Sequence, residues 1–308
     1  MPPSARLAPL YRREWGSGHP VIALHPLGLE SSAFAGFGRV LSARGVRVVA
    51  VDLPGFGKTP APDVPLTPAT LATPVIDMAR RMRRRPTLLG ISLGGRVALE
   101  AALTAPEAFE RVIAIAPALP WRRFRAVLAP LALLDPRLAS LVPLERAWPL
   151  LRWMAGVVER APCLRRDELA QAGARFVYYA ACPATRKSFL SAMREMMLAP
   201  AFGPDGFWTR LPDLSVPAVF MWGQRDMFVT SDFARPVEAS LPQAQQCMLE
   251  CVGHWLNGLH HRCLAHAVAS LLDERGQQRA SKRTYSCTVD VHQGSDAMDH
   301  ATGSRSHA

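Results

Sequence analysis

Residues 87–102 read TLLGISLGGRVALEAA, and this short stretch constrains the fold more than any other part of the chain. The pattern G-x-S-x-G at residues 90–94 lies between an apolar run, Thr87 to Leu89, and the helical pattern of Arg96 to Ala102. A serine in a strained turn between a strand and a helix needs glycine on both sides, because side chains there would collide with neighbouring backbone. The context therefore predicts that Ser92 is a nucleophile.

A serine nucleophile requires a carboxylate and a histidine later in the chain, because a serine hydroxyl reacts poorly at neutral pH. Asp226 follows an apolar run and a turn, FMWGQRD at residues 220–226, and His254 follows the next apolar run in the tripeptide GHW. The intervals leave room for an inserted segment before Asp226, and for one helix and one strand after it. We predict the order Ser92, Asp226, His254, with Asp232 as the competing acid because it lies close by and could also cap a helix.

The same chemistry needs two backbone N–H donors for the oxyanion of the intermediate. One is predicted at Leu93, the residue after the nucleophile, and the other at Leu27, in the loop that follows the first core strand. Three further histidines lie in a helical pattern and are predicted to be surface or packing residues: His260, His261 and His266.

Short apolar runs rich in β-branched residues alternate with longer helical patterns, which predicts an α/β fold with a mainly parallel central sheet and helices on both faces. An antiparallel edge strand is expected near Leu7 to Trp15. The predicted core strands are Val21 to His25, Val46 to Asp52, Thr87 to Ser92, Arg111 to Pro117, Ala218 to Asp226 and Gln246 to Val252.

The strand rhythm stops between Pro117 and about Pro212, where aromatic residues occur among leucines and prolines at helical spacing. We therefore predict a core formed by 1–117 and 213–275, with a helical cap at 118–212 that contains Trp121, Phe124, Trp148, Trp153, Phe176, Tyr178 and Tyr179. The polar composition of 276–308 predicts a disordered tail.

Five ordered motifs resemble the α/β-hydrolase family over about residues 7 to 275, the cap excluded. They are HPLG (25–28), DLPGFG (52–57), GISLGG (90–95), WGQRD (222–226) and GHW (253–255). The resemblance implies attack of Ser92 on a carbonyl carbon, a covalent intermediate and hydrolysis by water, with no metal or organic cofactor. It also implies that His25 structures its loop and is not the base. Pro26 stands where the family usually has glycine.

An ester of a carboxylic acid is the first substrate class that the resemblance implies, and the apolar cap favours a hydrophobic acyl or aromatic group. An aspartate in place of Ser92 would have suggested dehalogenase or epoxide-hydrolase chemistry. Two alternatives remain open: a carbon–carbon bond hydrolase of aromatic catabolism, and a member of the fold that binds a small ligand without turning it over. The former needs an arginine for the substrate carboxylate, for which Arg122, Arg123, Arg125 and Arg186 are available.

The formal net charge of +11 comes mainly from arginine and favours weak attraction to anionic surfaces, so a lipid-surface protein is a third alternative. No nucleic-acid-binding motif is present. The densest basic run, RRMRRR at residues 80–85, is predicted to be the solvated end of a helix that leads into a strand, with a polyanion site as the alternative.

The six cysteines form no C-x-x-C pair, which favours reduced thiols and a cytoplasmic protein. The first residues show no secretory signal pattern, and no apolar run approaches the roughly 18 residues of a spanning helix. Oligomeric state is not encoded in any pattern of the sequence.

Overall fold

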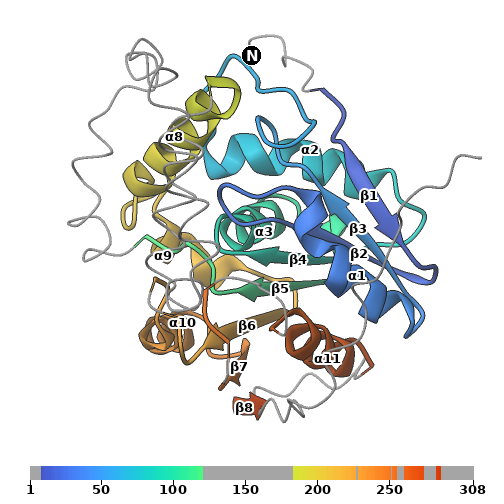
Figure 1. Ribbon diagram of the computed structural model, residues 1–308. Helices are drawn as coiled ribbons and strands as arrows, with labels where there is room; N and C mark the ends of the chain where they lie inside the picture. Colours follow the sequence, from blue (N-terminus) through green and yellow to red (C-terminus); the bar gives the residue numbers. More distant parts are fainter. Residues whose placement is uncertain are drawn as a thin grey trace, which may run out of the picture.

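The computed structural model describes residues 8–120, 183–226, 228–250, 252–254, 260–273 and 282–285. Their centre is an eight-stranded sheet in the order β1-β3-β2-β4-β5-β6-β7-β8, in which only β1 runs antiparallel to its neighbour (Figure 1). The strands are β1 (Arg12–Trp15), β2 (His19–Leu24), β3 (Val46–Val51), β4 (Thr87–Ile91), β5 (Arg111–Ile115), β6 (Ala218–Gly223), β7 (Gln245–Leu249) and β8 (Lys282–Tyr285). The predicted α/β class, the six core strands and the antiparallel edge strand are confirmed.

Strand β8 corrects one prediction. It pairs in parallel with β7, placing Lys282 beside Gln246 and Tyr285 beside Leu249. These four residues belong to the segment 276–308, for which polar composition predicts a disordered tail, and for them that prediction is wrong. A strand at the edge of a sheet needs few apolar residues, because its backbone bonds to the neighbouring strand stabilise it.

Helices cover both faces of the sheet (Figure 1). Alternate residues of the buried strands point to opposite faces, so Ala23 packs in one cluster with α1 and α11, whereas Ile22 and Leu24 pack in the other with α2 and α3. The helices are α1 (Ala35–Ser42), α2 (Pro68–Arg80), α3 (Leu93–Thr104), α8 (Pro183–Leu198), α9 (Phe207–Arg210), α10 (Ala234–Ser240) and α11 (His260–Asp273). Short 3₁₀ turns precede, follow or connect them at Ser31–Phe34, Pro106–Ala108, Leu211–Asp213 and Ser231–Phe233.

Most of the predicted cap, 121–182, lies outside the described residues, together with its aromatic residues from Trp121 to Tyr179 and with Arg122, Arg123 and Arg125. The described remainder of 118–212 is largely helical. Phe207, Trp208 and Leu211 are buried in the same cluster as the residues of α2 and α3, so α9 packs directly on the core.

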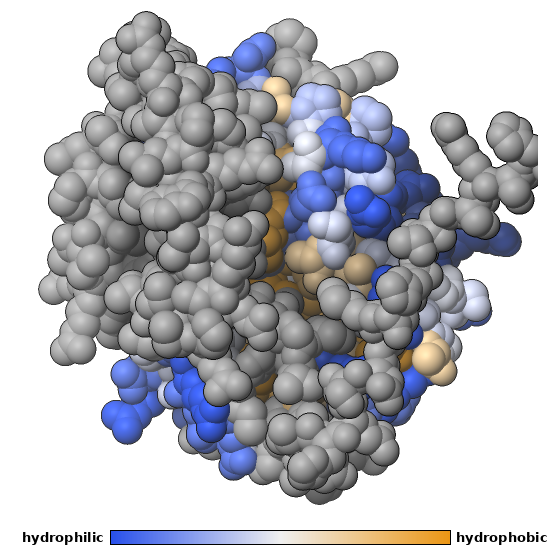
Figure 2. All heavy atoms as spheres, in the orientation of Figure 1, coloured by the Kyte–Doolittle hydropathy of each residue, from blue (hydrophilic) through white to orange (hydrophobic). Residues whose placement is uncertain are grey.

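The basic run lies where the sequence places it. Helix α2 ends at Arg80, the following arginines are exposed, and β4 begins at Thr87. Arg80 pairs with Glu107 at 2.6 Å, and both side chains are more than half exposed. On the face shown in Figure 2 the described surface is largely hydrophilic, and hydrophobic residues show mainly as a narrow strip near the position of α3 in Figure 1.

The cysteines differ from the expectation of reduced thiols. Cys263 on α11 is disulfide-bonded, whereas Cys247 on β7 is a buried thiol that forms no disulfide. The prediction of a cytoplasmic protein assumed reduced cysteines, and the disulfide at Cys263 removes that support. No helix within the described ranges is long and apolar enough to span a bilayer.

Candidate active site

Ser92 occupies a strained turn between β4 and α3. Its φ of 53° lies in the left-handed region that residues with a Cβ rarely adopt, and its N–H donates to the Ile115 carbonyl at 3.0 Å. A Cβ added to Gly94 would collide with the backbone of Leu24 and His25, and one added to Gly90 would collide with the backbone of Gly94. The glycines of G-x-S-x-G therefore serve the close backbone approach that the sequence predicts.

Asp226 is held by the turn that follows β6. The N–H groups of Gln224 and Arg225 donate to the carbonyls of Leu249 and Val252, at 3.0 and 3.3 Å, so this turn is tied to the end of β7. One carboxylate oxygen of Asp226, Oδ1, accepts the N–H groups of the turn residues Phe228 and Val229, at 2.8 and 2.7 Å. The other oxygen is left for a partner from the loop after β7.

That partner is His254. Its Nδ1 lies 2.8 Å from Asp226 Oδ2, and its Nε2 lies 3.1 Å from Ser92 Oγ. All three side chains are buried. Because the carboxylate accepts a hydrogen bond from Nδ1–H, the ring proton stays on Nδ1, and the lone pair of Nε2 is directed at the Ser92 hydroxyl. The carboxyl ends of three strands thus bring together the residues that the sequence singles out at positions 92, 226 and 254.

The competing residues lie elsewhere. Asp232 is exposed in the short helix Ser231–Phe233, where its carboxylate accepts from Thr230 Oγ1 at 3.4 Å. His266 is exposed on α11, with Nδ1 2.9 Å from Arg44 Nη2, which confirms its predicted surface position. The side chains of His260 and His261 lie outside the described part.

The two predicted oxyanion donors are at the same edge of the sheet. Leu93 is the first residue of α3, where the N–H groups of a helix have no intrahelical acceptor and the helix dipole favours negative charge. Leu27 occupies a turn closed by the Leu29 N–H donating to the Pro26 carbonyl at 3.1 Å, with Gly28 at a φ of 75°. Within the described ranges, no backbone or side-chain acceptor engages the N–H of either leucine.

His25 fixes this loop, as predicted. Its Nε2 accepts the N–H of Leu53 at 3.0 Å, so Nδ1 carries the proton and donates to the Pro26 carbonyl at 2.9 Å. Burial lowers the pKa of His25, which keeps the ring neutral and preserves both bonds. The departure at Pro26 is compatible with the turn, because the turn uses the proline carbonyl and not the missing N–H.

Asp52 supports the loop from the other end, and its role was not apparent from the sequence. Its two carboxylate oxygens accept the N–H groups of Ser31, at 2.6 Å, and of Lys58, at 2.8 Å. A Cβ at Gly57 would collide with the Asp52 carboxylate, which explains the second glycine of DLPGFG. The signal in the sequence is an acidic residue directly after an apolar strand and before a glycine-rich turn.

Within the described residues, no group of three or more His, Cys, Asp or Glu side chains is arranged to hold a metal ion.

The sequence profile of the alpha/beta hydrolase family matches residues 21–266, which is most of the chain.

The chain belongs to the alpha/beta hydrolase family.

The curated relatives that resemble the chain include carbon–carbon hydrolases and esterases. The 2-hydroxy-6-oxo-6-phenylhexa-2,4-dienoate hydrolase of Burkholderia cepacia is 27% identical over 259 residues, covering 82% of this chain and 86% of that protein. The pimeloyl-[acyl-carrier protein] methyl ester esterase of Aliivibrio salmonicida is 23% identical, covering 80% and 88%.

Solved structures of alpha/beta hydrolases share the fold. The enol-lactonase of Burkholderia xenovorans LB400 has a TM-score of 0.64 at 22% identity and covers 86% of this chain and 96% of its own. A thermophilic esterase from Thermogutta terrifontis has a TM-score of 0.65 at 20% identity and covers 86% and 93%.

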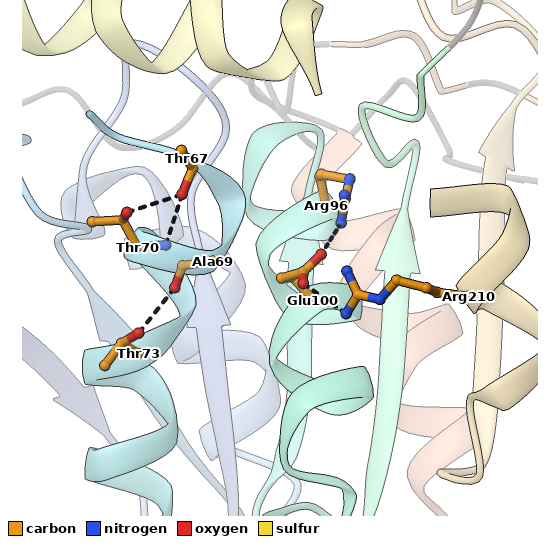
Figure 3. Close-up of polar contacts among 7 residues, drawn as sticks. All are labelled: Thr67, Ala69, Thr70, Thr73, Arg96, Glu100 and Arg210. Carbon is orange, nitrogen blue, oxygen red and sulfur yellow. Dashed lines mark hydrogen bonds and ion pairs between the residues drawn. The ribbon is translucent and has the colours of Figure 1, made fainter. Parts of the chain in front are cut away.

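The sequence reasoning missed an ionic cluster that involves two buried residues of the helix after Ser92 and one partly exposed arginine (Figure 3). Arg96 and Glu100 on α3 pair with each other, and Glu100 also pairs with Arg210 of α9. The available signal was an arginine and a glutamate four residues apart within an otherwise apolar helix.

Proposed function

We propose that the protein is a serine hydrolase of carboxylic esters or related carbonyl compounds, with Ser92 as nucleophile, His254 as base and Asp226 as the residue that orients the histidine. The observation that carries the proposal is the continuous hydrogen-bonded chain from Asp226 Oδ2 through the His254 ring to Ser92 Oγ. A backbone N–H at Leu93 and another at Leu27 lie at the same edge of the sheet as this chain.

The geometry gives each group one task. Ser92 Oγ attacks the carbonyl carbon while its proton passes to His254 Nε2, and the Asp226 carboxylate stabilises the imidazolium through Nδ1–H. The carbonyl oxygen becomes an oxyanion that the N–H groups of Leu27 and Leu93 stabilise. When the intermediate collapses, His254 returns the proton to the leaving alcohol. Water then attacks the acyl-enzyme with the same base, and the acid is released as Ser92 regains its proton.

An ester is the preferred substrate class. Esterases occur both among the curated relatives and among the structural neighbours, and ester cleavage requires only the groups described above. We propose a hydrophobic acyl group, because the predicted cap is rich in apolar and aromatic residues.

A carbon–carbon hydrolase is the second candidate, and two observations favour it. Relatives from Burkholderia, Cupriavidus and Comamonas carry names of dienoate or dioate hydrolases, whose substrates bear a carboxylate. Arg186, on α8, is a fully buried cation. Helix α8 is attached to the segment that follows β3, because Ser191 Oγ accepts the Leu66 N–H at 3.1 Å. A guanidinium can bind a carboxylate through two parallel hydrogen bonds, which makes Arg186 the candidate residue for the substrate carboxylate.

The first experiment is intact-mass spectrometry after treatment with a fluorophosphonate. A single adduct on the native protein, absent from Ser92→Ala and present in the exposed control Ser32→Ala, is the expected result. No adduct on a folded native protein would refute the hydrolase and favour a ligand-binding member of the fold.

The second experiment separates the two substrate classes. Steady-state turnover of p-nitrophenyl esters is compared with turnover of 2-hydroxy-6-oxo-6-phenylhexa-2,4-dienoate, in the native protein and in Arg186→Met. Preference for the dienoate, with a KM that rises in Arg186→Met for this substrate alone, would replace the esterase by the carbon–carbon hydrolase.

A further inference from the structure

The helix that follows the nucleophile contains a charged pair where apolar residues would be expected. Every residue from Leu93 to Ala102 on α3 is buried, and two of them are Arg96 and Glu100. Arg96 Nη1 donates to Glu100 Oε2 at 2.8 Å, and the two side chains are 5% and 6% exposed. Both ions have therefore left water almost completely, which is costly unless they are paired.

Glu100 also binds a second helix. Its other carboxylate oxygen, Oε1, accepts from Arg210 Nη2 at 2.8 Å, and Arg210 is the last residue of α9 (Figure 3). Burial raises the pKa of Glu100, but the two arginines outweigh it, so the net pKa is lowered and the side chain is an anion. One carboxylate thus joins α3 to α9, with a separate oxygen for each guanidinium.

Arg96 makes a second contact with α9. Its guanidinium lies 4.4 Å from the centre of the Phe207 ring, in the geometry of a cation–π interaction. The Phe207 ring packs edge-on against Trp208, whose indole N–H donates to the Pro120 carbonyl at 2.9 Å. The cluster therefore extends from α3 through α9 to the segment that follows β5.

That segment, Pro117 to Pro120, lies directly against the nucleophile turn. The N–H of Ala118 donates to the Ser92 carbonyl at 3.0 Å, and that carbonyl also accepts the first backbone bond of α3, from the Arg96 N–H. A Cβ at Gly95 would lie 3.0 Å from Pro117. Contacts therefore link α3 to α9, α9 to the segment 117–120, and that segment to the Ser92 turn at the start of α3.

We propose that Pro117–Pro120, which bonds to the Ser92 carbonyl, forms one wall of the acyl-binding site, and that Arg96, Glu100 and Arg210 are positioning residues that set its shape by holding this segment and α9 against the nucleophile helix. Hydrogen bonds between charged groups are directional, and here each guanidinium binds a different oxygen of the Glu100 carboxylate. The cluster therefore fixes the position of α9 along α3, whereas apolar side chains at the same place would allow the two helices to shift relative to each other. The inference deepens the proposed function and rests on it.

The experiment measures acyl-chain selectivity, as the ratio of kcat/KM for p-nitrophenyl octanoate to that for p-nitrophenyl acetate. In Glu100→Gln the two arginines lose their shared anion, and we expect the ratio to change at least tenfold relative to the native protein. Arg210→Gln should change it in the same direction, because it breaks the bond to α9 and leaves the Arg96–Glu100 pair. The control is Glu107→Gln, which breaks the exposed pair with Arg80 and should leave the ratio unchanged.

A second variant keeps the proposal testable if Glu100→Gln folds poorly. Arg96→Met/Glu100→Leu replaces the buried ion pair by apolar side chains of similar size, a change that is often neutral or stabilising, and Arg210 is partly exposed and can turn to water. The proposal expects native-like thermal stability with an altered selectivity ratio in this variant. A native ratio in this double variant would overturn the proposal, because it would show that the charges serve stability alone.

Fluorophosphonate labelling of the native protein distinguishes this failure from that of the proposed function. Labelling at Ser92 together with a selectivity ratio that no variant changes refutes only the positioning role. Absence of labelling refutes the hydrolase itself.

Discussion

The replacement Asp226→Asn tests the proposed site most directly, because the structure dictates how the asparagine amide must be oriented. Oδ1 accepts two backbone N–H groups, from Phe228 and Val229, so the amide oxygen has to occupy that position. The amide NH₂ group then takes the place of Oδ2 and points a donor at His254 Nδ1. The histidine is forced into the Nε2–H tautomer, whose Nε2 can no longer accept the proton of Ser92.

The expected loss follows from that tautomer. In the serine–histidine–aspartate arrangement such a change lowers kcat by about 10⁴-fold, which corresponds to about 5.4 kcal/mol of transition-state stabilisation. The two backbone bonds to the turn remain, so the free energy of unfolding should fall by only about 1 kcal/mol. Turnover of a p-nitrophenyl ester and urea denaturation measure the two quantities on the same preparation.

The matched control is Asp232→Asn, at the exposed competing acid, which should retain native turnover. Turnover of Asp226→Asn within tenfold of the native protein, or a large loss in Asp232→Asn, would refute the assignment of the acid. A large loss of stability in Asp226→Asn would instead contradict the inferred amide orientation.

Three further predictions concern the supporting structure. Gly94→Ala should cost more than about 3 kcal/mol of unfolding free energy, because its Cβ overlaps fixed backbone; an unchanged denaturation midpoint would contradict this. Ala116→Gly should raise the unfolding free energy by about 1 kcal/mol, because Ala116 has a φ of 40°; a lower midpoint in urea would show that the strain is compensated elsewhere. Burial holds the pKa of His25 below its ordinary value of 6.5. The stability that the neutral ring contributes is therefore present above pH 6.5 and is lost as the pH falls below 6.5, by at most about 1.4 kcal/mol per pH unit. His25→Gln should show a weaker fall in urea midpoint between pH 7.5 and 5.5 than the native protein, and equal falls would exclude this linkage.

Much of the fold could be predicted because its determinants are local. Parallel strands that are buried on both faces have continuous apolar sequences, so the sequence predicted β2 to β7 within a few residues of their observed bounds. Strand β8 was missed because Lys282–Tyr285 carries no apolar run, and its pairing with β7 is a long-range event. The disulfide at Cys263 was missed for the same reason, since a cysteine without a spacing motif gives no sign of its partner.

The sequence by itself determined the strained turn at Ser92 and predicted an acid and a histidine later in the chain, because glycines around a serine and polar residues at strand ends are local patterns. Only the tertiary structure showed that Asp226, and not Asp232, contacts His254, at 2.8 Å, because both aspartates follow the same strand and their sequence positions do not distinguish them. Only the tertiary structure revealed that Glu100 on α3 pairs with Arg210 on α9. Contacts between residues more than a hundred positions apart depend on how helices pack on the sheet, and no local pattern encodes that distance.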